Sequence, residues 1–264
     1  MTTDNLEKNY DPGGVRLLDF GDLLFGSCRR VSHIKRYSSI PVVRAENVAE
    51  HSYYVCLIAM AIATDYMRRT KDDSKINMGH LLQCAIVHDI DEALTGDVLR
   101  SVKHGDPAIK SAFDSFAKRV VIGLEQSIGM PFLALWENQK SDTLEGYILS
   151  LSDLLSVVSY VVEELRSGNS GVYRILHEVA GWITKLQERY TNKIPNNAFF
   201  YCNFAQEMIL SQLKKWEHLE SKLQLEPGED YHFVEFYSGE YKDMLEYYGK
   251  KFNERSVTLG SQSS

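Results

Sequence analysis

The sequence lacks a long apolar run and an apolar N-terminal stretch. Its longest apolar run, Tyr53–Thr64, is shorter than the roughly 20 residues that a membrane-spanning helix needs. The first residues, Met-Thr-Thr-Asp-Asn-Leu-Glu-Lys, carry no apolar segment of the kind that a secretory signal contains. We therefore expect a cytoplasmic protein without a membrane partner.

Basic residues and cysteines are also scarce. The net charge is −7, from 29 Lys and Arg against 36 Asp and Glu, whereas a non-specific nucleic-acid binder normally has a basic balance. We therefore expect no nucleic-acid partner. The 4 cysteines form no Cys-x-x-Cys pair, which disfavours a zinc finger or a redox motif. With 44% hydrophobic and 25% charged residues, the composition is that of a globular protein.

The pattern of apolar residues predicts an all-α fold. Only 6 prolines are present, and apolar residues recur at spacings of three and four, the period of an α-helix. Asn47 with Glu50 forms a capping-box pattern, and Asp106-Pro107 has the sequence of a helix start. We expect helices over Asn47–Arg69, Asn77–Asp89, Asp106–Ser127, Asp142–Gly168, Gly171–Tyr190 and Asn196–Leu225.

The C-terminal part differs in composition from the rest. A boundary signal, Pro227-Gly-Glu-Asp230, is followed by residues rich in tyrosine and acid, with strand-like alternation over Tyr231–Tyr237. We expect a main domain over residues 1–195 and a mainly helical extension over 196–264, whose last residues, Ser261–Ser264, are disordered.

Four polar residues lie where an apolar pattern leaves no room for an unpaired charge. His88 and Asp89 end an apolar helix, Asp153 lies among leucines and valines, and His51 begins a helix that becomes fully apolar. A buried charge is costly unless it is paired or binds a metal. Any one of these residues alone would be an ordinary core or surface residue. Together, two imidazoles and two carboxylates satisfy a divalent cation better than they satisfy one another.

At these residues the sequence resembles a known family. The order His, His-Asp, Asp on successive helices is similar to the signature of HD-domain metal-dependent phosphohydrolases, and the closer match is to the bacterial 5′-deoxynucleotidase (YfbR-like) branch. The resemblance covers roughly residues 20–190 and implies an HD-domain helical bundle. The segments that carry it are Arg44–Ser52, His88–Asp97, Val102–Lys103, Leu151–Leu155 and Glu163–Asn169.

The resemblance implies a metal site and a catalytic pair. It makes His51, His88, Asp89 and Asp153 the ligands of one divalent metal ion. Mn, Co, Mg, Zn, Fe and Ni all stay open, with Co or Mn favoured. Glu92 matches the acid that works beside the metal-bound water, and it lies three residues after Asp89, which is one helical turn. Arg36 matches the arginine that orients the phosphate, for which its planar fork of donors is suited.

The resemblance also implies a sugar-binding segment, with two departures from the family pattern. Asp97 matches the residue that contacts the deoxyribose, and Val98 and Leu99 follow it in the substrate-binding segment. Tyr37 stands where the branch has tryptophan, which makes selectivity for deoxyribose less assured. Arg100 stands where the branch has a neutral residue, and it adds a charge near the substrate. We expect the neighbouring Asp91 and His104 to be surface residues.

The function implied is removal of the 5′-phosphate from deoxynucleoside 5′-monophosphates by water, in a protein that forms a homodimer. Two alternatives stay open. One is a deoxynucleoside triphosphate triphosphohydrolase, for which Arg100, Lys103, Arg29 and Arg30 would supply extra positive charge. The other is a regulatory protein that binds a nucleotide without turnover, although no ligand or catalytic acid has been lost from the motifs.

Overall fold

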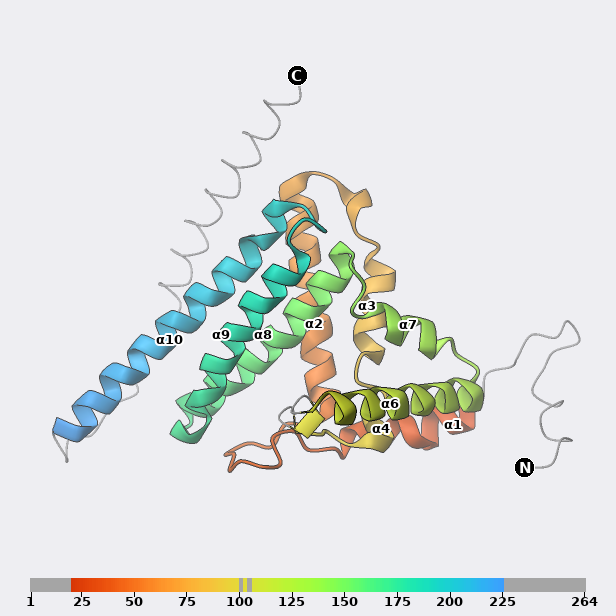
Figure 1. Cartoon of the computed structure of the whole chain (residues 1–264), viewed down its shortest axis with the longest axis horizontal. Coiled ribbons are helices and arrows are strands. Elements are labelled where there is room, and N and C mark those ends of the chain that lie inside the picture. Colours follow the sequence, from red (N-terminus) through yellow and green to blue (C-terminus); the bar gives the residue numbers. More distant parts are fainter. Residues whose placement is uncertain (1–19, 100–101, 104–105, 226–264) are drawn as a thin grey trace, which may run out of the picture. The chain divides into compact units, whose positions relative to one another are not determined.

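The computed structural model describes residues 20–99, 102–103 and 106–225, and helices dominate this part of the chain (Figure 1). Within these residues the β pairing is limited to one isolated antiparallel bridge between Lys35 and Asn47. The predicted all-α class is therefore confirmed. Among the same residues, no helix combines the length and the hydropathy that crossing a membrane requires.

The chain divides into two compact units. The first contains Ala45–Cys56, Leu82–Gln139 and the described residues up to Pro41; the second contains Val42–Arg44, Leu57–Leu81 and the described residues from Lys140 onward. The helices are α1 (Phe20–Phe25), α2 (Val48–Thr70), α3 (Met78–Val87), α4 (Glu92–Thr95), α6 (Pro107–Ile128), α7 (Phe132–Asn138), α8 (Leu144–Arg166), α9 (Tyr173–Tyr190) and α10 (Phe200–Leu225), with 3-10 turns η3 (Ser27–Ser32), η4 (Asp73–Lys75), η5 (Ser170–Val172) and η6 (Asn196–Phe199).

Three helix starts lie where the sequence predicts them, because each is fixed by its own capping residue. Before α2, Asn47 Oδ1 accepts from the Glu50 N–H at 3.0 Å, and Glu50 Oε2 accepts from the Asn47 N–H at 3.2 Å. Asn77 caps α3 through the His80 N–H, and Asp106 caps α6 through the N–H groups of its first turn. Each cap is worth about 1 kcal/mol.

The first unit has its own apolar core. One face of α6 is buried against α7 and the end of α3, and α1 and α4 also contact α6. The buried members of this core are Val87, Val120, Val121, Leu124, Ile128 and Phe132. Helix α7 and its partly buried Trp136 are therefore held by the same core that fixes the end of α3.

In the second unit, α8, α9 and α10 lie side by side (Figure 1). Helix α9 shows the cause most clearly: its buried residues, Leu176, Val179, Ile183, Leu186 and Tyr190, recur at spacings of three and four. These residues form one apolar face that packs on α8 and α10. Most of the buried residues of α8 are apolar, so Asp153 lies on a largely apolar helix.

A few details differ from the sequence prediction. The cap of α8 is Thr143, which accepts from the Gly146 N–H, whereas Asp142 pairs with Lys193 at 3.0 Å. The short helices α1 and α7 have no counterpart in the prediction, since short segments give little periodic signal. The predicted boundary at Pro227, the alternation over Tyr231–Tyr237 and the tail lie outside the described residues. The division after residue 195 stays a prediction.

Candidate metal centre

Two buried histidines form the centre of the candidate site. His51 lies in the first turn of α2 and is 0% exposed, and His88 follows α3 and is 4% exposed. Their ring centroids are 5.4 Å apart. His88 Nδ1 lies 2.7 Å from the carbonyl oxygen of Ala85, which can only accept, so we assign the proton to Nδ1. That assignment gives His88 Nε2 a lone pair, the state in which an imidazole binds metal.

The carboxylate of Asp89 faces both histidines. Its Oδ2 lies 3.1 Å from His88 Nε2, 3.7 Å from His51 Nε2 and 3.6 Å from Arg36 Nη1. Burial by itself raises the pKa of Asp89, but His88, His51 and Arg36 outweigh it and hold this pKa below its ordinary range. These neighbours therefore favour the carboxylate form of Asp89, the form that binds a cation.

The fourth predicted ligand, Asp153, belongs to the second unit. Asp153 is half-buried on α8. Two imidazole nitrogens with carboxylate oxygens form a mixed donor set that suits a divalent transition-metal ion. The residues present therefore fit such an ion.

Arg36 lies beside this cluster and is 12% exposed. Its Nε is 3.3 Å from Glu46 Oε2, and its backbone N–H donates to the Glu46 carbonyl at 2.9 Å. The guanidinium thus lies between Glu46 and Asp89, which fixes its position. Glu46, only 3% exposed, was not predicted as part of the site, and its place two residues before the α2 helix gave no signal of this contact.

The buried Glu92 and the half-buried Asp97 add acidic groups to the same unit. Burial raises the pKa of Glu92 to about 10, and the charges of Asp89 and Asp97 act in the same direction while Arg36 opposes them. Burial also raises the pKa of Asp97, although Arg36 opposes it. Glu92 Oε2 is buried and has no hydrogen-bond partner among the described residues. A carboxyl oxygen of this kind can donate or accept a proton.

The segments that flank this cluster contain the remaining predicted residues. Tyr37 has a φ of 57°, a left-handed conformation that is unusual for a non-glycine residue. Its backbone N–H donates to the Asp97 carboxylate, and its ring lies 5.6 Å from the Arg36 guanidinium carbon. After Asp97 come the half-buried Val98 and the exposed Leu99, whereas Arg100 lies outside the described residues.

The prediction that Asp91 is a surface residue is wrong. Asp91 is only 4% exposed, and its Oδ1 accepts a hydrogen bond from Trp136 Nε1 at 2.9 Å. Burial and the nearby Asp89 charge raise its pKa, and the Trp136 bond opposes that rise. Trp136 comes from α7, 45 residues away, so the sequence around Asp91 did not reveal its partner. His104 lies outside the described residues.

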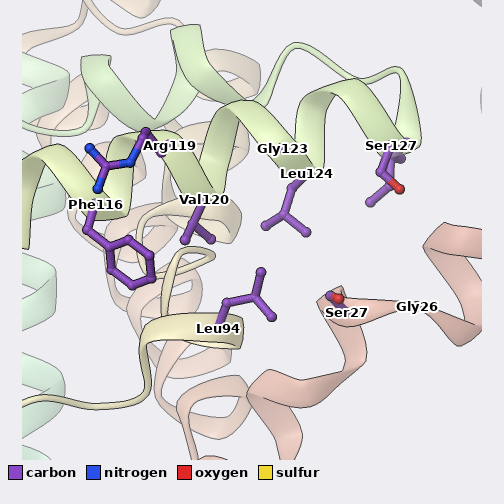
Figure 2. Close-up of a pocket in the computed structure, with 10 residues that line it drawn as sticks. Gly26, Ser27, Leu94, Phe116, Arg119, Val120, Gly123, Leu124 and Ser127 are labelled. Carbon is purple, nitrogen blue, oxygen red and sulfur yellow. The ribbon is translucent and has the colours of Figure 1, made fainter. Parts of the chain in front are cut away.

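A separate apolar pocket of about 340 Å³ lies beside α4. Figure 2 shows Leu94 of α4 facing Val120 and Leu124 of α6, with Gly26 and Ser27 at its edge. None of the histidines or acidic residues described above lines this pocket. The pocket is therefore distinct from the candidate metal centre, although Leu94 is only two residues from Glu92.

These helices and the buried His–Asp cluster define the class of the protein: the fold is that of HD-domain phosphohydrolases. Residues 23–208 match the family described as 5′-deoxynucleotidase YfbR-like, and the chain belongs to that family. The expected fold and family are thus confirmed, and the match makes the protein a hydrolase. It also extends beyond the residues 20–190 that carry the resemblance in the sequence.

Individual relatives agree with this assignment. The chain is 27% identical over 192 residues to a 5′-deoxynucleotidase of Vibrio atlanticus, covering 71% of this chain and 94% of the relative. A conserved hypothetical protein from Pyrococcus furiosus has the same fold, with a TM-score of 0.55, 21% identity and coverage of 72% and 98%. An HD phosphohydrolase of cyanophage S-2L, bound to dA and one catalytic Zn²⁺ ion, gives a TM-score of 0.51, 17% identity and coverage of 72% and 96%.

Proposed function

We propose that this protein is a metal-dependent 5′-deoxynucleotidase, which hydrolyses deoxynucleoside 5′-monophosphates to deoxynucleosides and phosphate. The family supports the activity, and relatives such as the Vibrio protein bear that name. The observation that carries the proposal is the placement of Arg36 beside the His51–His88–Asp89 cluster, with Nη1 3.6 Å from Asp89. A cation and an arginine at one place form a site for a phosphate.

His51, His88, Asp89 and Asp153 would hold one divalent ion, with Co²⁺ or Mn²⁺ favoured. When bound, such an ion polarises a phosphoryl group and makes water a better nucleophile near neutral pH. The cyanophage relative contains Zn²⁺, so the identity of the ion is a matter for measurement. In this assignment Asp89 lies between Arg36 and the two imidazoles, where it can connect the ion with the phosphate-binding group.

Arg36 would bind the phosphate oxygens, and Glu92 would supply a proton to the leaving oxygen. Arg36 is already held by Glu46 and Asp89, and it can donate to the phosphate oxygens without first ordering a mobile side chain. Water adds to phosphorus, the bond between phosphorus and the 5′-oxygen breaks, and a proton must reach that oxygen. Glu92, whose buried Oε2 has no hydrogen-bond partner among the described residues, can deliver the proton.

Tyr37 and Asp97 would form the sugar side of the site. The interaction between the Tyr37 N–H and the Asp97 carboxylate supports this assignment. Asp97 can accept a hydrogen bond from a deoxyribose hydroxyl, and the Tyr37 ring can occupy the space that a 2′-hydroxyl would need. Val98 and Leu99 would line the same segment, and we also propose that Arg100 contributes charge to it.

The test is product analysis with purified protein and Co²⁺ or Mn²⁺. dAMP, AMP, dATP and ATP are supplied separately, and every product is separated by chromatography. We expect deoxyadenosine and phosphate from dAMP, with little adenosine from AMP. Intact triphosphate from dATP would replace the proposal by a triphosphohydrolase, and binding without any product would make the protein regulatory.

One variant connects the activity to an assigned ligand. Asp153→Asn should lose metal retention and activity together, since it removes a ligand charge. A metal-loaded and fully active Asp153→Asn variant would contradict the ligand assignment.

The homodimer is part of the same proposal, and analytical ultracentrifugation of the wild-type protein tests it directly.

A further inference from the structure

The turn between α3 and α4 carries two proposed functional residues, and Asp91 lies between them. Asp89 precedes it by two residues and Glu92 follows it directly. The Asp91 carbonyl accepts from the N–H groups of Leu94 at 3.1 Å and Thr95 at 3.0 Å, so Asp91 is the N-cap residue of α4. The orientation of Asp91 therefore sets the direction in which Glu92 enters the helix.

The side chain of Asp91 is hydrogen-bonded to helix α7 of the same unit. Its Oδ1 accepts from Trp136 Nε1 at 2.9 Å. Trp136 and Leu133 of α7 pack against the core formed by α6 and the end of α3. The Leu133 N–H also donates to Glu125 of α6 at 2.9 Å, which fixes the start of α7 on its neighbour. The indole is thus held on the core of the first unit, against which Ile90 of the turn also packs.

We propose that Trp136 is a positioning residue, which acts through Asp91 to hold the Asp89–Glu92 turn in its working orientation. This inference rests on the proposed function, because it concerns the same metal-binding and catalytic residues. A buried carboxylate without a donor is costly, so a turn that lost the indole N–H would rotate Asp91 toward water. Asp89 and Glu92 lie within two residues of Asp91 in the sequence and would move with it.

The decisive variant is Trp136→Phe, which keeps an aromatic ring in the core and removes the Nε1–H. Outer partners of metal sites typically change metal affinity or activity 10–100-fold when they are removed. We expect kcat to fall by about 10–100-fold, with KM changing less than about threefold, and Co²⁺ affinity to fall by roughly tenfold. Trp182→Phe on α9 is the matched control, because it removes an indole N–H far along the chain from the turn, and it should leave all three values unchanged.

Two variants of Asp91 separate the hydrogen bond from simple packing. Asp91→Asn keeps an oxygen that can accept from the indole, whereas Asp91→Leu has a similar size and cannot accept. We expect Asp91→Asn to retain kcat and Co²⁺ affinity within about threefold of wild type, and Asp91→Leu to resemble Trp136→Phe. Circular dichroism checks that each variant is folded at the assay temperature.

The Co²⁺ titration also keeps this inference apart from the proposed function. If wild type binds Co²⁺ but does not hydrolyse dAMP, the proposed function fails, and the Co²⁺ affinities still decide the role of Trp136. Folded Trp136→Phe protein with wild-type Co²⁺ affinity and kcat would overturn the inference. It would equally be overturned if Asp91→Asn were as impaired as Asp91→Leu, because the acceptor oxygen would then not be the feature that matters.

Discussion

Glu164 provides a sharp test of how the chain before α2 is held in the second unit. This side chain is 1% exposed. Its Oε2 accepts from the Val43 N–H at 2.7 Å and from Asn169 Nδ2 at 2.8 Å, and its Oε1 accepts from the Arg44 N–H at 2.8 Å. One carboxylate of α8 therefore binds two consecutive backbone N–H groups.

Glu164→Gln keeps the shape of this side chain but leaves one acceptor oxygen. Either one or two of the three donors must then face an amide NH₂ group. A hydrogen bond to a charged group contributes about 1.5–3 kcal/mol, so we expect the unfolding free energy to fall by about 2–4 kcal/mol at pH 7. The neighbouring Glu163→Gln is the control: Glu163 is 57% exposed and pairs with Arg44 at 3.5 Å, an interaction worth less than about 1 kcal/mol.

The difference between wild type and Glu164→Gln should depend on pH. Burial raises the pKa of Glu164, but the bonds from Asn169, Arg44 and Val43 outweigh it and leave this pKa below the ordinary 4.5. A lowered folded-state pKa gives stability that is present above 4.5 and lost as the pH falls through the folded-state value. Urea unfolding at pH 7 and near pH 3 measures the unfolding free energy above and below the ordinary pKa of the Glu164 carboxyl group. A loss below about 0.5 kcal/mol at pH 7, or one that is equal at both pH values, would refute this reasoning.

Four further predictions concern catalysis, backbone and selectivity. Glu92→Gln should retain its metal and lose about 10²–10⁴-fold in kcat; undiminished kcat would move the proton transfer elsewhere. Gly123→Ala should raise the unfolding free energy by about 0.5–1 kcal/mol, since its Cβ would meet nothing within 4 Å. Gly146→Ala should lower it, because its Cβ would collide with the Ser141 carbonyl. Thermal unfolding measures the change in stability of both glycine variants. Tyr37→Ala should loosen discrimination between dAMP and AMP, and an unchanged ratio of kcat/KM would show that the ring does not face the sugar.

The parts of the fold that the sequence predicts are those set by nearby residues. Asn47 and Glu50 are three residues apart and cap each other, so the start of α2 can be read directly. Asp106 likewise caps α6 through residues two and three positions later. Long helices with one apolar face, such as α9, give a repeated signal that short helices do not.

The contacts that the sequence does not predict join residues far apart in the chain. Asp91 was expected at the surface because it is charged and lies outside the matched motif positions. Its burial depends on Trp136, which stands on α7, a helix too short to be predicted. Glu46 is similar: its carboxylate lies beside the Arg36 guanidinium, ten residues earlier, across a turn with no regular period. Such pairs are properties of the fold rather than of the local sequence.

The acidic groups of the first unit indicate how a cation would assist Arg36. Burial raises the pKa of Asp91, Glu92 and Asp97, and the charge on Asp89 raises all three further. Each carboxylate thus makes ionisation of the others less favourable. Arg36 opposes this effect at Glu92 and Asp97, but its Nε and Nη1 already lie beside Glu46 and Asp89. We expect that a divalent ion on Asp89 and the imidazoles would offset the charge on Asp89 and leave the guanidinium better able to attract a phosphate.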